Sequence, residues 1–263
     1  MDEPDVGLFG PDSVTWRVHA DPATLVGGMR ALLVQALNPV AMAAVAQYDN
    51  FRDDPWGRFR RTSDYLTTTT FGDRASAEAA AARVRALHRR VHGVDPVTGR
   101  SYRADDPDLL LWVHAVEVES FLVAYRRYAW PLSDDDADRY VAEMVRAAEL
   151  VGLARDDVPA TVADLADYLA SVPLALTPAA RDGMRLVFAP PMPLPARPLW
   201  ALLGAAAVAI LPPRARSLYG LPWAPLATPV VRAGVGTLLR IVNAALPPPP
   251  PVRAAFARAR SAA

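Results

Sequence analysis

The chain has 263 residues, a formal net charge of zero and a hydrophobic content of 52%, which is enough for one large domain or two small ones with a substantial core. The neutral balance argues against a nucleic-acid partner, because there is no basic excess to neutralise phosphates. Cysteine and lysine are both absent, which excludes disulfides, thiolate metal sites, covalent c-type haem, a cysteine nucleophile, lysine Schiff bases and the P-loop lysine. The side chains left to bind a transition metal are the carboxylates and four histidines, His19, His88, His92 and His114.

Neither a signal peptide nor a transmembrane segment is expected. The N-terminal MDEPDVGLFGPDS is acidic and lacks the charged-then-apolar order of a signal peptide. The longest apolar run, Leu199–Leu211, is shorter than the roughly 20 residues that a bilayer crossing needs. We therefore expect a cytoplasmic protein. Exposure of Leu199–Leu211 would favour a homodimer or contact with a membrane surface, whereas burial would make it a core helix.

The N-terminal part is expected to hold an irregular lead-in followed by two apolar helices. Residues 1–20 form the lead-in, with one short element around Val14 to His19. His19 precedes the turn signal Asp21-Pro22, so it is expected to be exposed or to cap a helix. From Pro22 to Gln47 the sequence is almost uncharged, and Asn38-Pro39 divides it into two helices. Such helices are normally buried, but they can also wall a pocket for a greasy ligand.

Trp56 to Phe71 is expected to begin as a helix, on which Arg58, Arg61 and Thr62 lie within one turn of each other, with Tyr65 close by. Guanidinium and hydroxyl groups beside a pocket can hold an anion, a carboxylate or bound dioxygen. The alternative is a solvated basic face. The four threonines at positions 67–70 are expected to disfavour a regular helix, because β-branching and hydroxyl bonds to the backbone compete with it.

The next helix, expected between Asp73 and Gly93, carries His88 within an apolar stripe. An inward-facing imidazole needs partners for its ring nitrogens, so His88 is either a core histidine bonded to a backbone carbonyl or a metal ligand. His92 follows at the four-residue spacing of zinc and di-iron sites, but the arginines between the two histidines disfavour a dication. The stripe consists of Val84, Leu87 and Val91.

A strong helix is expected from Leu109 to Tyr128, preceded by the capping residues Asp106 and Pro107. Its first half is apolar nearly all round and should be interior. His114 and Glu117 share its inward face, and they form either a hydrogen-bonded structural pair or a working acid–base pair.

The rest of the chain is also expected to be helical. Ser133 caps a helix over Ala137–Val151, and shorter helices follow to about residue 242. Residues 246–263, rich in Pro, Ala and Arg, are expected to be disordered. No strand is expected, so the fold class is all-α, with one helical domain over residues 21–245.

Several segments, taken in chain order over residues 20–225, resemble one family: the oxygenases typified by the fungal mycophenolic-acid-pathway enzyme MpaB and by the bacterial latex clearing protein, a rubber oxygenase. The resembling segments are LLVQALNPVAMAAVAQ, PWGRFRRTSDYL, FGD, VRALHRRVHG, YRADDPDLLLWVHA, LSDDD and LPPRARSLYGLP.

The resemblance implies a globin-like core around non-covalently bound haem b. The family's iron ligand lies in a V-R-x-x-H-x-x-V segment, which corresponds to His88. The rubber oxygenase also has an Arg-x-x-Lys-Thr motif on the other side of the haem, which is matched by Arg58, Arg61 and Thr62. These three residues are therefore expected to offer hydrogen bonds to bound dioxygen or, for the arginines, to a haem propionate.

The chain departs from the family pattern at two places. Arg61 stands where the lysine is expected, and a guanidinium stays protonated, so a lysine-capped resting state is not expected. The relative also uses a carboxylate base on the preceding helix, whereas residues 24–48 contain no Asp or Glu. Their polar side chains are Gln35, Asn38 and Gln47, and Asp49 in the following loop is the nearest substitute. This argues against polyisoprene cleavage but does not affect haem binding.

The resemblance therefore indicates a haem-dependent oxygenase or oxidase that acts with dioxygen on a hydrophobic, unsaturated small molecule. The walls of the substrate pocket would come from residues 25–45. Two alternatives stay open at this point. One is a non-catalytic protein that binds haem or a lipophilic ligand, and the other is a helical scaffold in which His88 is structural.

Overall fold

A computed structural model describes residues 5–48, 51–221, 228–245 and 247–262. The described chain is mostly helical, which confirms the all-α class, with one short hairpin and two single-turn 3-10 helices at Arg155–Asp157 and Leu194–Ala196. The α-helices are α1 Val14–His19, α2 Ala23–Gln35, α3 Pro39–Tyr48, α4 Pro55–Phe71, α5 Arg74–His88, α6 Pro107–Tyr128, α7 Asp134–Val151, α8 Val162–Ser171, α9 Pro178–Phe188, α10 Arg197–Ala209, α11 Pro213–Tyr219, α12 Thr228–Ala245 and α13 Pro250–Ala262. The strands are β1 His92–Val94 and β2 Ser101–Arg103.

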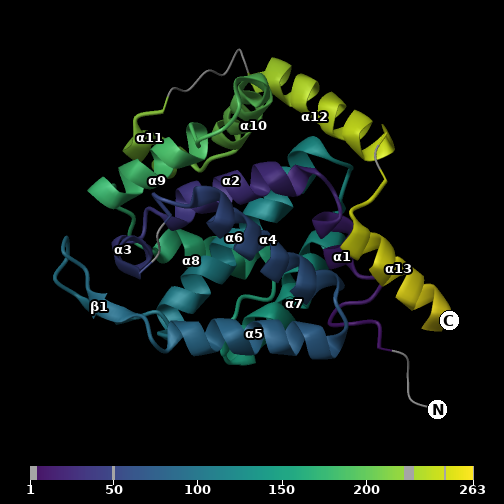
Figure 1. The fold of residues 1–263 in the computed structure, drawn as a ribbon, viewed down its shortest axis with the longest axis horizontal. Coiled ribbons are helices and arrows are strands. Elements are labelled where there is room, and N and C mark those ends of the chain that lie inside the picture. Colours follow the sequence, from purple (N-terminus) through teal and green to yellow (C-terminus); the bar gives the residue numbers. More distant parts are fainter. Residues whose placement is uncertain (1–4, 49–50, 222–227, 246, 263) are drawn as a thin grey trace.

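Helices α2 and α6 form the centre of the fold and cross each other in Figure 1. Their contact is close because Gly27 has no side chain. A Cβ at this position would lie 2.6 Å from the Phe121 ring and 3.1 Å from the Ser120 carbonyl oxygen. Helix α5 runs along one edge of the molecule, and α9 to α12 lie on the opposite edge (Figure 1).

A buried arginine ties the central helices together. Arg30 on α2 is 1% exposed and donates to both carboxylate oxygens of Glu119 and to the Ser120 hydroxyl on α6. Its Nε donates to the Ile210 carbonyl just after α10, at 2.9 Å. Because every side of the guanidinium has a partner, the cost of burying this charge is offset.

The first twenty residues contain one buried helix, α1, which confirms the short element expected around Val14 to His19. Glu143 on α7 accepts hydrogen bonds from the backbone N–H groups of Val14 and Thr15, at 3.2 and 2.8 Å. These are N–H groups at the start of α1, which have no partner within the helix. The Trp16 indole donates to the Thr70 carbonyl at 2.8 Å and is 1% exposed.

The expected disruption at the four threonines does not occur, since α4 continues to Phe71. The Thr69 hydroxyl donates to the Tyr65 carbonyl at 2.9 Å, so its bond to the backbone is made within the helix rather than against it. Thr69, Thr70 and Phe71 are buried. Tertiary packing therefore overrides the low helix propensity of this run.

The structure corrects the expected end of the next helix. Helix α5 stops at His88, not at Gly93, and His92 is exposed at the start of the hairpin. Strand β1 pairs antiparallel with β2, with Gly93 opposite Tyr102. His88 and His92 therefore do not share a helix face, and Leu87, expected in the inward stripe, is 60% exposed. Strands of three residues give too short a pattern to be recognised by periodicity.

The expected disorder of residues 246–263 is wrong for Pro250–Ala262, which form α13. Val252, Ala255 and Ala259 recur at helical spacing and pack with Trp16 and Phe71. Proline is well tolerated in the first turn of a helix, so the proline run begins this helix instead of preventing it.

The apolar run Leu199–Leu211 is only partly interior. Leu203, Ala206 and Leu211 are buried, whereas Leu199 is 52% exposed. Within the described residues no single helix is long and apolar enough to cross a membrane. Two bent pairs of consecutive helices reach that length and composition only in combination, Ala23–Gln35 with Pro39–Tyr48 and Pro229–Ala245 with Pro250–Ser261.

Candidate functional site

His88 lies at the C-terminal end of α5, on the face that packs towards α4 and α7. Ala77, Ala81 and Val84 precede it on this face at helical spacing, and the first two are buried. The imidazole is half-buried, and its Nδ1 atom is fully buried without a hydrogen-bond partner among the described residues. Burial lowers the pKa of His88, against the opposing charge of Asp105. His88 is therefore a neutral imidazole with an unsatisfied nitrogen, not a core histidine bonded to a carbonyl.

His88 opens onto a hollow of about 210 Å³ between α5, α6 and the end of α7. This volume is below the range of roughly 300–1,000 Å³ that is usual for ligand pockets. The Gly152 backbone, with φ of +109°, closes one side of it. The residues that line the hollow are Arg85, His88, Arg89, Asp105, Leu110, Val151 and Gly152.

One face of α6 continues from this hollow into the interior. Leu110 lines the hollow, and His114 and Glu117 follow it at helical spacing. Burial lowers the pKa of His114 to about 4 and raises that of Glu117 to about 7. In the described part of the chain neither side chain has a hydrogen-bond or ion-pair partner, so the expected structural pair is not formed. The acid–base interpretation stays a prediction.

Two tyrosines surround Glu117 from neighbouring helices. Burial, and then the charge of Glu117, raise the pKa of Tyr65 on α4 to about 12. The same two causes, with a further contribution from Glu143, raise the pKa of Tyr140 on α7 well above its ordinary value. Glu117 is thus an interior carboxyl between α4, α6 and α7. Its side chain is half-buried, and desolvation by burial is the cause of its raised pKa.

The expectation that His19 is exposed or caps a helix is wrong. Its Nδ1 lies 3.0 Å from the Thr70 hydroxyl and its Nε2 lies 3.0 Å from the Tyr140 hydroxyl. Its ring meets Phe121 edge-on, with 5.1 Å between ring centroids. Burial lowers the pKa of His19 to about 4. Both ring nitrogens are occupied, so His19 is a structural residue beside the site rather than a ligand.

The three predicted residues of α4 are not equivalent. Arg58 is half-buried, and burial, followed by the charge of Arg61, lowers its pKa. Arg61 is exposed, with its Nη1 3.4 Å from a carboxylate oxygen of Asp54. Thr62 is also exposed. They lie within one turn of each other on α4, as expected, but Arg58 is the one of the three that is partly buried.

Several large apolar side chains stay accessible on the helices that build this region. Leu25 and Leu32 on α2 are 45% and 37% exposed, and Val113 on α6 is 40% exposed. Gly28, between the two leucines on the same face, would meet nothing within 4 Å of an added Cβ. Gln35, one turn further on, donates to the Val113 carbonyl at 3.0 Å, which joins this face of α2 to that of α6.

The polar side chains of α2, α3 and their connection are already used within the fold. Besides the Gln35 bond, Asn38 accepts from the N–H groups of Val40 and Ala41. Gln47 bonds to the Val94 carbonyl and to the Tyr102 hydroxyl. Asp49, the suggested substitute for the missing carboxylate, lies outside the described residues. The sequence does not indicate that the charge of Glu117 acts on Tyr65, because the two residues lie on helices far apart in the chain.

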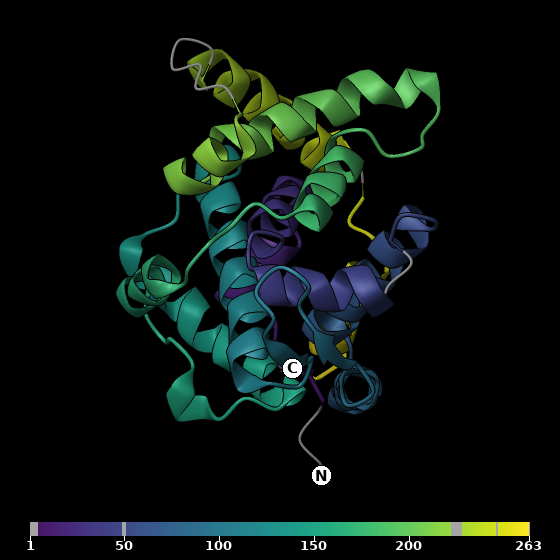
Figure 2. The same cartoon turned by 90° about the vertical axis from the view of Figure 1, so that its left-hand side faces the viewer.

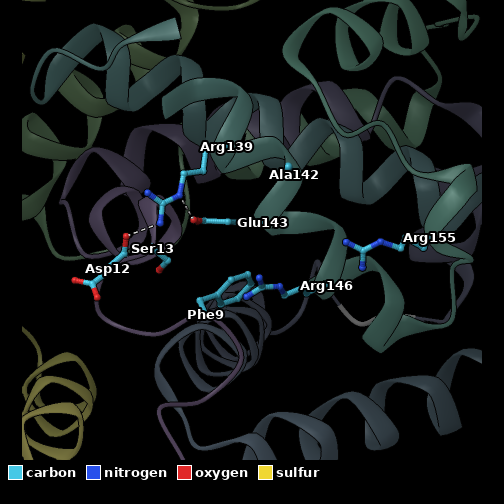
Figure 3. A pocket seen from close by; sticks show the side chains of 8 residues that line it. All are labelled: Phe9, Asp12, Ser13, Arg139, Ala142, Glu143, Arg146 and Arg155. Carbon is cyan, nitrogen blue, oxygen red and sulfur yellow. Dashed lines mark hydrogen bonds and ion pairs between the residues drawn. The ribbon is translucent and has the colours of Figure 1, made fainter. Parts of the chain in front are cut away.

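A second hollow, of about 360 Å³, lies on the outer side of α7 and contains three arginines (Figure 3). Its polar groups serve structural purposes. Arg139 donates to Glu143 and to the Asp12 carbonyl, while Arg146 donates to the Leu8 carbonyl at 3.0 Å. They fasten the N-terminal segment to α7, and none of the predicted site residues lines this hollow. In the described chain no group of three or more histidine, aspartate or glutamate side chains is placed to hold a metal ion.

A comparison with protein families finds one match over residues 16–241, to the description "ER-bound oxygenase mpaB/B'/Rubber oxygenase, catalytic domain". The matched region contains all the residues of the candidate site. No curated protein and no solved structure matches the chain.

Proposed function

Because the chain belongs to the family of the mpaB and rubber oxygenase catalytic domains, we propose that it is an oxygenase that uses a b-type haem bound through His88. Family membership makes the chain an oxygenase and decides against a non-catalytic binding protein or a scaffold. The haem, its ligand, the globin-like arrangement around it and the substrate are the proposal.

The observation that carries the proposal is the unsatisfied Nδ1 of His88. A buried imidazole nitrogen without a partner lowers the stability of the folded state. Such an arrangement is explained if the ring serves to bind a ligand, with the tautomer set by which nitrogen the ligand uses. The low pKa of His88 keeps the ring neutral, as a metal ligand must be. A single histidine is sufficient to hold haem iron, so no cluster of metal ligands is needed. The hollow of about 210 Å³ beside His88 is smaller than usual ligand pockets, so haem binding would require the helices around it to move apart.

When bound, haem would supply the activation of dioxygen, which is chemistry of the cofactor itself. The protein would supply binding, orientation and protons. Arg58 is the cationic donor best placed to hold a haem propionate or a polar oxygen, since it is the one of the three α4 residues that is partly buried. Arg61, paired with Asp54 on the surface, would act on Arg58 through its charge.

Glu117 is the interior carboxyl that this chain offers in place of one on α2. With a pKa of about 7 it exchanges a proton near neutral pH, which is the range in which general acids and bases work best. The accessible apolar face of Leu25, Leu32 and Val113 would receive a hydrophobic, unsaturated substrate. The absence of carboxylates from residues 24–48 argues for a substrate other than polyisoprene.

The proposal is tested by the absorption spectrum of the purified protein after reconstitution with haem. A Soret band is expected for the parent, and His88→Ala should lose it or shift it strongly. His92→Ala is the matched control, because His92 is exposed four residues further on. If His88→Ala kept full haem with an unchanged spectrum, the assignment of the ligand would be wrong. Absence of haem binding by the parent would remove the haem from the proposal.

A further inference from the structure

The charges of this neutral protein are divided unevenly along the chain. Asp182 is the last acidic residue, and nine arginines follow it. Because the whole chain is neutral, residues 1–182 carry nine more acidic than basic side chains. Charge asymmetry of this size between two parts of a chain is typical of contact with a membrane or another polyanion.

Most of the acid-free segment is gathered at one end of the molecule. Helices α10 and α12 pack on each other, and with α9 and α11 they form the green and yellow-green layer at the top of Figures 1 and 2. Helix α13 leaves this layer and packs along α4. Five exposed arginines belong to the layer: Arg185, Arg197, Arg214, Arg232 and Arg240. Arg185 is paired with Asp182 on the same helix, and Arg216 is buried.

The same layer exposes large aliphatic side chains. Leu194 and Leu199, at the start of α10, are 71% and 52% exposed. Val230 and Ile241 on α12 are 72% and 58% exposed. Apolar side chains that gather on one surface are typical of a site that contacts a membrane or another protein.

On helix α12 exposed aliphatic side chains and arginines occur together. Val235 and Leu239 are buried against the rest of the layer. Val230 and Ile241 lie on its outer side, and the exposed Arg240 is adjacent to Ile241. Arg232 is also exposed, but it lies nearer the side of α12 that faces Tyr128 on α6. An apolar strip bordered by arginine and free of acidic side chains is the pattern of a helix that lies in the interface of an anionic bilayer.

We propose that the layer of α9 to α12 is a docking surface for an anionic membrane, on which the protein lies without crossing it. Nucleic acid fits less well, because the aliphatic side chains would face phosphates and would find no apolar phase to enter. A second copy in a two-fold dimer fits less well too, because arginines would face arginines. The proposal is independent of haem. It would bring the oxygenase to the phase in which hydrophobic substrates dissolve.

The test is co-sedimentation of the full chain with vesicles of phosphatidylcholine, with and without phosphatidylglycerol, at low and high salt. The parent should bind the anionic vesicles, and salt should weaken the binding. Each basic residue near an anionic surface contributes about 1 kcal/mol, so R197Q/R232Q/R240Q should lower the partition coefficient by roughly a hundredfold. The matched control R83Q/R90Q/R100Q removes three exposed arginines from the acidic part of the chain and should bind like the parent.

The aliphatic contribution is tested separately by V230N/I241N, which should weaken binding to anionic vesicles by at least about tenfold. Its control, V94N/V97N, changes two valines of the hairpin region with 52% and 56% exposure and should have no effect. The proposal is overturned if the parent ignores anionic vesicles, or if it binds neutral vesicles equally well. It is also overturned if V230N/I241N binds like the parent, which would show an anion site without lipid contact, or if light scattering shows a dimer that this variant abolishes.

Discussion

The interior holds two kinds of polar group, and they lie in different regions. Around Arg30 and Glu143, donors and acceptors are matched across helices far apart in the chain. Around His88, His114 and Glu117, ionisable groups are desolvated and form no such bonds among the described residues, and Nδ1 of His88 is fully buried without a partner. In the first region the hydrogen bonds offset the free-energy cost of burying the polar groups. In the second region the unpaired groups lower the stability of the folded state. Groups kept in this condition are the ones available for a ligand or for proton transfer.

The largest effect on stability is expected in the matched region. Arg30→Ala leaves the Glu119 carboxylate and the Ser120 hydroxyl without their partner at the contact of α2 and α6. Breaking a buried ion pair from one side costs about 3–5 kcal/mol, and urea denaturation of the haem-free protein measures this. The control is Arg52→Ala, which removes an exposed pair with Asp182 and should cost at most about 1 kcal/mol. Equal losses for the two variants would show that the matched region has no special structural weight.

A smaller effect, with a distinctive pH dependence, is expected from Glu117. Its pKa is raised from 4.5 to about 7 in the folded protein. Between these values the folded state binds more protons than the unfolded state, so this group makes stability fall as pH rises from about 4.5 to 7. Glu117→Gln removes that contribution and should increase the stability at pH 8 by roughly 1–3 kcal/mol.

His19 and His114 act in the opposite sense and serve as the reference. Their folded pKa values of about 4 lie below the ordinary 6.5, so each contributes stability that is present above pH 6.5 and lost as pH falls towards 4. The free energy of unfolding, measured from pH 4 to pH 8, should therefore rise more steeply with pH in Glu117→Gln than in the parent. Parallel curves for the two proteins would show that Glu117 is solvated and is not an interior carboxyl.

The parts of the fold that the sequence predicts are those with local signals. The helix break at Asn38-Pro39, the long helix α6 and the helix α7 all occur where caps and periodicity place them. Ser133 accepts from the Asp136 N–H, and Gly152 ends α7 with a positive φ. The hairpin is not predictable from periodicity because its strands have three residues each. The proline-rich composition of the C-terminal segment conceals the helical spacing of Val252, Ala255 and Ala259 in α13.

The candidate site was only partly accessible to such reasoning. The sequence predicts that His88, His114 and Glu117 face inwards, because helical spacing decides that locally. It does not reveal that His19 is satisfied by Thr70 and Tyr140, which lie 51 and 121 residues away in the chain. Nor does spacing show which residues of α4 are exposed, because that depends on the neighbouring helices.

The smallest expected effect separates Arg58 from Arg61, which the family motif treats together. Arg58 is half-buried and desolvated, so truncation to alanine removes a partly buried cation. Arg61 is 58% exposed at its side chain and paired with Asp54, so truncation mainly removes a screened surface charge. In the haem-loaded protein, Arg58→Ala should change the affinity for cyanide or dioxygen severalfold, equivalent to about 1 kcal/mol. Arg61→Ala should change it less, because it acts only through its charge on Arg58.

Ligand titration followed in the visible spectrum compares the two, and an equal response would place both guanidinium groups, or neither, beside the bound ligand. Both variants keep His88, so a difference between them would show that α4 also holds two kinds of polar side chain, one used for the fold and one used for the ligand.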